Sequence, residues 1–491
     1  ILLEIIGLLA LPLVWRIYPH LPDGGSALAK IVGTLVLGWT TWFVVSLGVF
    51  GHRQGTALLI LILLGAAAAW WAWRKRAELA AVWRAKKNHW LTAELVFLVA
   101  FAGYMVTKLY NPDINNPFGQ GYNGGGEPMG MTFFTAVFQS LHFPPYDPWL
   151  SGYPINYYYF GQVILGVLAK LTGVPPNWSY QITISLLFAL TVTGLYGLGV
   201  GLTGRRRWGL AAAAAGAMFG NLHAWFYLLE PLNRGHAFTD GLAGIGRWLQ
   251  ETWRHAGRFE FIWNPTRLIK GTINEMPWFS FLYGDLHAHI IAIPYSLPVI
   301  GWALNLLRAP AGPARRFPEA GNGDRTDRIM TFVVAALALG SLSAINTWNF
   351  PPYALLVLGV LVTSVWHQGE ASPAWRKLTR AGLGWLRLAA VGLACMFFFH
   401  LYFKPQSTTL AFVNPAVRTR LQDFLVFFGL PAFLIISAWA DQYRARLAEG
   451  WRRLSGGKDW RDPAGIARGL TAWPARSPAT FYPAASLAVA A

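Results

Sequence analysis

Residues 57–73 read ALLILILLGAAAAWWAW, a run without a single charge, and Arg74, Lys75 and Arg76 follow it directly. A helix needs about 20 mostly apolar residues to cross the hydrocarbon core of a bilayer. An apolar run closed by a basic cluster is typical of a membrane-spanning helix that ends at the cytoplasmic surface. This stretch therefore indicates an integral membrane protein, and the rest of the chain repeats the pattern.

The composition of the whole chain agrees with a membrane protein. Of its 491 residues, 54% are hydrophobic and 13% are charged, whereas about a quarter of the residues in a soluble domain are charged. The formal net charge is +18, but the basic residues gather in short segments between apolar runs, which argues against nucleic-acid binding. The single cysteine, Cys395, excludes a disulfide framework and a cysteine metal site.

The sequence predicts eleven membrane-spanning helices. Their approximate ranges are 2–18, 28–50, 57–73, 91–110, 179–203, 208–228, 288–307, 329–346, 352–368, 385–403 and 422–440. Lys and Arg favour the cytoplasmic side of a membrane, and they are concentrated in five segments. These segments are 74–87, 205–207, 308–328, 369–383 and 444–461. Residues 111–156 contain no Lys or Arg and are predicted to be external.

Residues 157–172 are apolar but are expected to lie along the external interface. If they crossed the membrane, the next helix would carry Arg205, Arg206 and Arg207 to the outside. In the interfacial arrangement, Tyr157, Tyr158 and Tyr159 hold their rings at headgroup level with their hydroxyls in water.

The predicted fold is an all-α polytopic membrane protein in three parts. N-terminal transmembrane helices occupy 1–90, and a transmembrane core occupies 91–440, with large external loops at 111–178 and 229–287. A basic cytoplasmic tail follows at 441–491. Because Ile1 lies inside an apolar run and the last residues are of low complexity, the sequence is expected to be incomplete at its ends.

The first external loop contains three acids, Asp113, Glu127 and Asp147. Asp113 and Asp147 stand beside prolines, where Asx-type turns are an alternative to a functional role. Glu127 follows three glycines, which allow a ligand to approach the backbone closely. It also precedes an apolar helix, so that a cap at the helix N-terminus is the alternative.

The second loop contains Asp285, His287 and His289, a set that suits a divalent metal. The alternative is that Asp285 caps the helix 288–307 and the histidines lie at the interface. Arg267 is a candidate phosphate ligand, with solvated surface charge as the alternative.

The run Pro144 to Trp149, followed by Gly152 and by 155–161 (INYYYFG), resembles the signature of the Chlor-Arch-YYY membrane protein family, also called the YYY domain. Further matching segments are 111–113, 273–275, 279–282, 284–287 with His289, and 346–348. The organisation of that family is similar to that of the GT-C glycosyltransferases, which use polyprenyl-phosphate sugar donors. The resemblance implies a GT-C-like fold and sugar transfer from a lipid-phosphate donor at the external membrane face.

The resemblance also implies roles for particular residues. The catalytic candidates are Glu127 and Asp113, and Asp285, His287 and His289 are candidate ligands of a divalent metal ion. The candidate substrate-binding residues are Asp147, Asn156, Tyr157, Tyr158, Tyr159, Arg267 and Glu275. The implied partners are membrane lipid, a polyprenyl-phosphate-linked sugar and other membrane subunits, with no nucleic acid.

The sequence departs from the family pattern at two positions. Gly130 stands where members often have an acid, and Asn349 follows Asn346-Thr347-Trp348 where an acid is usual. A non-catalytic subunit of a larger membrane complex is therefore the alternative function. A transporter ranks last, because no spanning helix was found to carry a mid-membrane acid or arginine.

Overall fold

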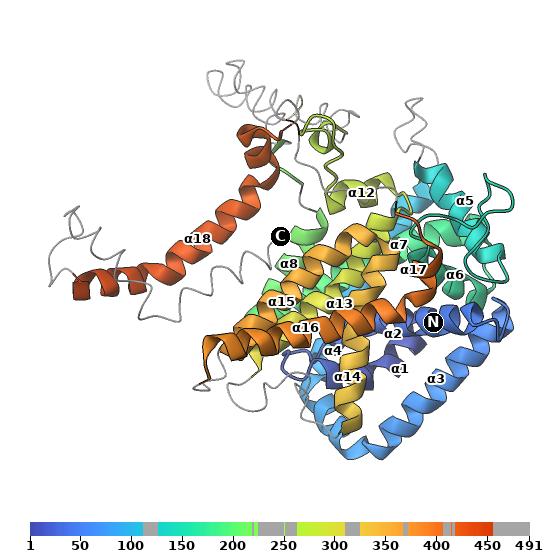
Figure 1. The fold of residues 1–491 in the computed structure, drawn as a ribbon, viewed down its shortest axis with the longest axis horizontal. Helices are drawn as coiled ribbons and strands as arrows, with labels where there is room; N and C mark the ends of the chain where they lie inside the picture. The colour runs from blue at the N-terminus through green and yellow to red at the C-terminus, as the bar shows by residue number, and fades with distance from the viewer. Residues whose placement is uncertain are drawn as a thin grey trace. The chain divides into compact units, whose positions relative to one another are not determined.

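The computed structural model describes residues 1–110, 126–218, 220–223, 250, 263–309, 325–366, 372–405, 414 and 418–454. Within these ranges the regular elements are helices, with one isolated bridge between Tyr146 and Pro154 (Figure 1). The chain forms two compact units. The first unit contains 1–219 and 277–410, and the second contains 220–276 and 411–491. The three consecutive parts expected from the sequence stay a prediction.

The helices of the first unit are α1 (Leu2–Ile17), η1 (Ser26–Leu28), α2 (Ala29–Ser46), α3 (Gln54–Arg74), α4 (Arg76–Tyr110), α5 (Gly126–Gln139), α6 (Phe160–Thr172), α7 (Pro176–Thr203), α8 (Arg206–Met218), α12 (Pro277–Tyr283), α13 (Ala288–Arg308), α14 (Arg325–Ile345), η4 (Thr347–Asn349), α15 (Phe350–Trp366), α16 (Ala374–Cys395) and α17 (Phe397–Tyr402). Those of the second unit are η2 (Asn264–Thr266) and α18 (Leu421–Leu454).

Among the described residues, eight helical segments are long and apolar enough to cross a membrane. They are Ser26–Ser46, Gln54–Arg74, Arg76–Leu109, Pro176–Thr203, Ala288–Arg308, Arg325–Ile345, Thr347–Trp366 and Leu421–Asp441. Each overlaps a predicted span, so that a multi-pass membrane protein is confirmed. The other three predicted spans fall on α1, on α8 and on the end of α16 with α17. The total of eleven therefore stays a prediction.

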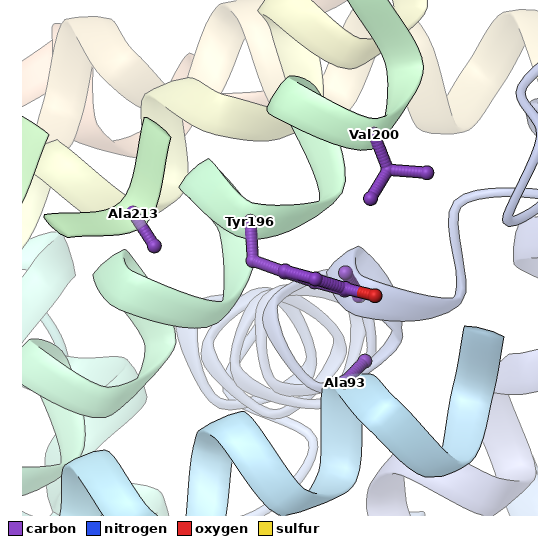
Figure 2. Packing of buried hydrophobic residues seen from close by; sticks show 5 residues of the cluster. Ala93, Tyr196, Val200 and Ala213 are labelled. Atoms are coloured by element: carbon purple, nitrogen blue, oxygen red, sulfur yellow. The ribbon is translucent and has the colours of Figure 1, made fainter. Parts of the chain in front are cut away.

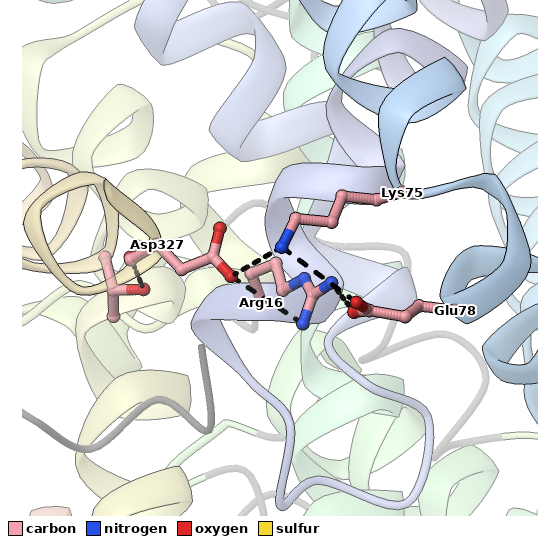
Figure 3. A network of polar contacts seen from close by, with 5 residues as sticks. Arg16, Lys75, Glu78 and Asp327 are labelled. Carbon is pink, nitrogen blue, oxygen red and sulfur yellow. Dashed lines mark hydrogen bonds and ion pairs between the residues drawn. The ribbon is translucent and has the colours of Figure 1, made fainter. Parts of the chain in front are cut away.

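Ion pairs join Arg16, Lys75, Glu78 and Asp327 at one end of the first unit, here called the basic end (Figure 3). The buried carboxylate of Asp327 at the start of α14 lies 3.8 Å from an Arg16 nitrogen and 4.0 Å from Lys75 Nζ. Glu78 pairs with Arg16 and lies 3.9 Å from Lys75 Nζ. The segments 74–87 and 308–328, which the sequence placed on one membrane side, therefore meet in a single network with Arg16.

The other end of the first unit, here called the tyrosine end, contains the loop 140–159. The His52 amide between α2 and α3 donates to the Leu141 carbonyl at 2.7 Å. The amide side chain of Asn156 exchanges two hydrogen bonds with the backbone of Lys404, at 2.9 and 3.0 Å. Loops from distant parts of the sequence are thereby joined at this end.

The core between the two ends is packed through small residues. Figure 2 shows the Tyr196 ring of α7 among Ala93, Val200 and Ala213, a cluster that joins α4, α7 and α8. Gly340 of α14 meets the backbone of Gly392 of α16 directly, and a side chain at either position would collide with the facing helix. Small residues at helix contacts allow such close approach in membrane proteins.

The α6 helix does not cross the first unit from end to end. Its 13 residues extend over about 20 Å at 1.5 Å per residue, less than the hydrocarbon core of about 30 Å. The three tyrosines before this helix were expected to hold their hydroxyls in water, but Tyr159 is only 3% exposed. Its ring packs 5.6 Å from Phe399 and 6.3 Å from Phe143. The prediction that all three tyrosine hydroxyls are wet is therefore wrong for Tyr159.

Candidate functional site

A buried carboxylate paired with an imidazole lies at the tyrosine end, in the turn between α12 and α13. Asp285 is 6% exposed, and its Oδ2 lies 2.6 Å from Nδ1 of His287. Its other oxygen, Oδ1, is buried and has no hydrogen-bond partner within the described structure. The residue that precedes α13 is His287, and no side-chain cap bond is formed there. The alternative role of Asp285 as a helix cap is therefore wrong.

The helix α5 packs directly on this carboxylate through Gly130. A Cβ atom at this position would lie 3.0 Å from Asp285 Oδ1 and 3.1 Å from the Tyr180 hydroxyl. The same hydroxyl accepts a hydrogen bond from the Leu286 amide at 3.1 Å, which fixes the turn against α7. An acid at position 130 would bring a second carboxyl group close to Asp285, whereas Gly130 leaves Asp285 as the one carboxyl group at this contact.

Aromatic side chains form a wall beside the pair. The Tyr157 ring lies 6.2 Å from His287, 5.6 Å from Phe133 and 4.8 Å from Tyr158. Burial, with smaller contributions from the nearby Tyr158 and Asp285, raises the pKa of Tyr157 to about 12. Tyr157 is therefore a neutral hydroxyl at ordinary pH, able to donate a hydrogen bond beside the carboxylate.

The three predicted metal ligands are close in space but are not arranged as a metal centre. The rings of His287 and His289 are 5.4 Å apart, and the Nδ1 of His287 is directed at Asp285. In the part of the chain that the structure describes, no three His, Cys, Asp or Glu side chains are grouped to hold a metal ion. The described residues therefore do not fit the divalent-metal site, and we assign no step to a metal.

The two predicted catalytic acids fall largely outside the described residues. Asp113 lies outside them, and so does the side chain of Glu127, although the backbone of Glu127 belongs to α5. Because α5 begins at Gly126, Glu127 occupies its first turn. Glu127 is three residues before Gly130, the position of α5 that lies close to Asp285. The predicted approach of the Glu127 carboxylate to Asp285 stays a prediction.

Two of the predicted substrate-binding residues make structural contacts. The carboxylate of Asp147 accepts hydrogen bonds from the amides of Trp149 and Leu150, at 2.8 and 3.1 Å. This is the Asx-type turn that the sequence offered as an alternative. The Asn156 amide is bonded to the backbone of Lys404, as described above. The half-exposed Tyr158 packs 5.4 Å from Phe403.

Arg267 and Glu275 belong to the second unit. The Arg267 guanidinium lies 4.0 Å from the centre of the Trp263 ring. Its Nη1 donates to the carbonyl and the hydroxyl of Thr266, at 2.9 and 2.7 Å. Glu275 is half-buried. We assign neither residue to the site around Asp285.

The sequence analysis missed a charge cluster inside the first unit. Lys30 of α2 lies 3.0 Å from a Glu4 carboxylate oxygen on α1 and also bonds the Glu94 carboxylate on α4. Its Nζ is 4.5 Å from the centre of the Phe97 ring. Lys30 and Glu94 both lie inside candidate membrane spans. The available signal was a charged residue near the start of each of three predicted spans, two acids and one lysine.

Eight apolar helical segments in the described part of the chain are long enough to cross a membrane. Ion pairs join charged residues of different helices at the basic end. Together these features define a polytopic helical membrane protein. Residues 36–490 match the family described as uncharacterized membrane protein (DUF2298). This match covers most of the chain, and the protein belongs to that family. No curated protein and no solved structure matches it.

Proposed function

We propose that this protein transfers a sugar from a polyprenyl-phosphate donor, at the membrane face where its tyrosine end lies. The observation that carries the proposal is the buried Asp285 carboxylate, bonded to His287 at 2.6 Å and packed against the helix that bears Glu127. Acids and imidazoles held in a partly dry site can move a proton and stabilise a departing phosphate. The resemblance to GT-C enzymes supplies the class of substrate.

The proposed reaction forms a bond between the acceptor oxygen and the anomeric carbon of the sugar. The bond from that carbon to the phosphate oxygen breaks, and the polyprenyl phosphate leaves with the electron pair. Glu127 takes the proton of the acceptor hydroxyl. His287 and the neutral hydroxyl of Tyr157 donate hydrogen bonds to the phosphate oxygens as their charge increases.

Turnover in reconstituted vesicles tests this proposal. The purified chain is placed in liposomes with undecaprenyl-phosphate-linked radiolabelled glucose or mannose, and the release of labelled sugar from lipid is measured. Glu127→Gln and Asp285→Asn are each expected to lower the rate by about 100-fold or more. Glu78→Gln at the basic end is the matched control and should retain the rate. Wild-type turnover by the Glu127→Gln protein would overturn the assignment of the base.

Asn349 favours the non-catalytic subunit as a second candidate. It stands where a family acid is usual, and its side-chain amide forms hydrogen bonds within the protein. It accepts from the Asn346 amide at 2.9 Å and donates to the Ser296 hydroxyl at 3.2 Å. A wild-type protein that releases no sugar from either donor but co-purifies stoichiometrically with another membrane protein would support this alternative.

A further inference from the structure

A hollow of about 590 Å³ lies within the second unit. It is lined by His223, Asn264, Arg267, Leu268, Gln422, Asp423 and Val426. Sites for small organic molecules have volumes of about 300–1,000 Å³. The hollow therefore has room for a ligand of the size of one or two sugar rings.

Backbone hydrogen bonds hold the walls of this hollow in place. The Leu222 amide donates to the Val426 carbonyl at 3.0 Å, which joins the segment 220–223 to α18. The side chain of Asn221 donates to the Pro265 carbonyl at 2.6 Å, which joins the same segment to η2. The segments that supply the polar side chains are thus fixed to one another, and a preformed site loses less entropy on binding.

The charges of the hollow favour a neutral ligand. Asp423 is held by Arg420 outside the lining, with nitrogen–oxygen distances of 2.9 and 3.3 Å. Arg267, the residue that follows η2, contributes the opposite charge and is bonded to Thr266. A phosphate would face the Asp423 carboxylate, and a cation would face the Arg267 guanidinium. An uncharged molecule that offers both hydrogen-bond donors and acceptors is repelled by neither the Asp423 carboxylate nor the Arg267 guanidinium.

We propose that this hollow binds a neutral polyhydroxylated ligand, a sugar. The amide of Gln422 can donate and accept, which matches neighbouring hydroxyl groups on a sugar ring, and Asn264 also lines the hollow. Leu268 and Val426 offer an apolar surface to the C–H face of the ring. The identification of this sugar as the acceptor of transfer rests on the proposed function, whereas its binding does not.

Binding of a sugar is measured on the full chain without any lipid-linked donor. The result therefore does not depend on whether the protein transfers sugar. The protein is purified in a detergent without a sugar head group, such as lauryldimethylamine oxide. Saturation-transfer NMR is recorded with methyl glucoside, methyl mannoside and methyl galactoside as probes. Asn264→Ala and Gln422→Ala are each expected to weaken the bound glycoside by about tenfold. Lys270→Ala, on the same loop but outside the lining, should leave the affinity unchanged.

Two further measurements protect the test against a variant that does not fold. The wild-type protein alone must give saturation transfer from at least one glycoside. Size-exclusion and circular dichroism profiles must match between variants and wild type. Absence of transfer from all three glycosides overturns the proposal, and so does equal affinity in the folded Gln422→Ala protein. Displacement of the glycoside by millimolar inorganic phosphate would identify an anion site and would also overturn it.

Discussion

A Cβ atom added at Gly130 would lie 3.0 Å from the Asp285 carboxylate and 3.1 Å from the Tyr180 hydroxyl, and this spacing limits which residues position 130 accepts. A larger side chain there would require Asp285 or Tyr180 to move. Glycine at position 130 therefore allows α5 to lie close to one buried carboxylate.

The substitution Gly130→Ala tests this close contact. Its Cβ would lie 3.0 Å from Asp285 Oδ1 and 3.1 Å from the Tyr180 hydroxyl, so that these buried side chains must move by a few tenths of an ångström. Overpacking of this kind destabilises a protein by about 1–3 kcal/mol. Gly103→Ala on α4 is the control, because no atom lies within 4 Å of its Cβ and alanine favours a helix by about 1 kcal/mol over glycine. Thermal unfolding of the two variants should therefore change in opposite directions. A Gly130→Ala protein as stable as the control would contradict the contact.

Lys30 offers a second test at the level of one side chain. Removing one partner of a buried ion pair leaves the other charge uncompensated and costs about 3–5 kcal/mol. Lys30→Met is expected to be strongly destabilised, because Glu94 is only 17% exposed. Glu94→Gln added to Lys30→Met should recover part of the lost stability. Denaturant unfolding of the single and double variants gives the coupling between them. If the single Lys30→Met variant and the double variant were equally stable, the charge of Glu94 would not need Lys30 to compensate it.

At the scale of elements, tertiary contacts decide what the apolar pattern leaves open. The α6 helix has the composition of a span but too few residues, and both of its flanking segments lie at the tyrosine end. The same packing gathers Glu4, Lys30 and Glu94 from three helices. A charge inside the span of α4 weakens the argument that ranked a transporter last, because such residues often mark ion pathways.

A buried histidine in the connection between α2 and α3 is expected to make the stability of the fold depend on pH. His52 is fully buried, and burial, with a smaller contribution from Lys170, lowers its pKa from 6.5 to about 3. As the pH falls below about 6.5, the unfolded chain takes up a proton that the folded chain refuses, so unfolding is favoured. His52 thus contributes stability that is present above pH 6.5 and is lost as the pH falls toward 3.

His52→Gln removes this titration and isolates its effect. Unfolding free energies of the wild type and the variant are compared at several values between about pH 7 and about pH 4. The wild type should lose stability relative to the variant as the pH falls, because the contributions of other groups cancel in the difference. A difference that is constant over this range would show that His52 takes up a proton equally well in both states.

For the whole molecule, composition predicts the class of protein, whereas tertiary contacts decide which residues form the candidate site. The basic segments 74–87 and 308–328 were placed on one side by charge alone, and the structure brings Lys75 and Asp327 within 4.0 Å of each other. The pairing of Asp285 with His287 and the assignment of Arg267 to another unit depend on tertiary folding. Periodicity and hydropathy carry no information about which distant turns meet.

The sidedness of the whole molecule is the remaining prediction that follows from charge. Segments dense in Lys and Arg stay cytoplasmic, so that the basic end should face the cytoplasm and the tyrosine end should face outward. Because Cys395 is the single cysteine, a Cys395→Ser background allows new cysteines to be labelled one at a time. Ser151→Cys, at an exposed position in the tyrosine-end loop, should react with a membrane-impermeant maleimide on intact cells. Ala85→Cys, at an exposed position near the basic end, should react only after the membrane is opened. The reverse pattern would invert the topology, and it would place the Asp285 site on the cytoplasmic side, away from the external face that the proposed transfer reaction requires.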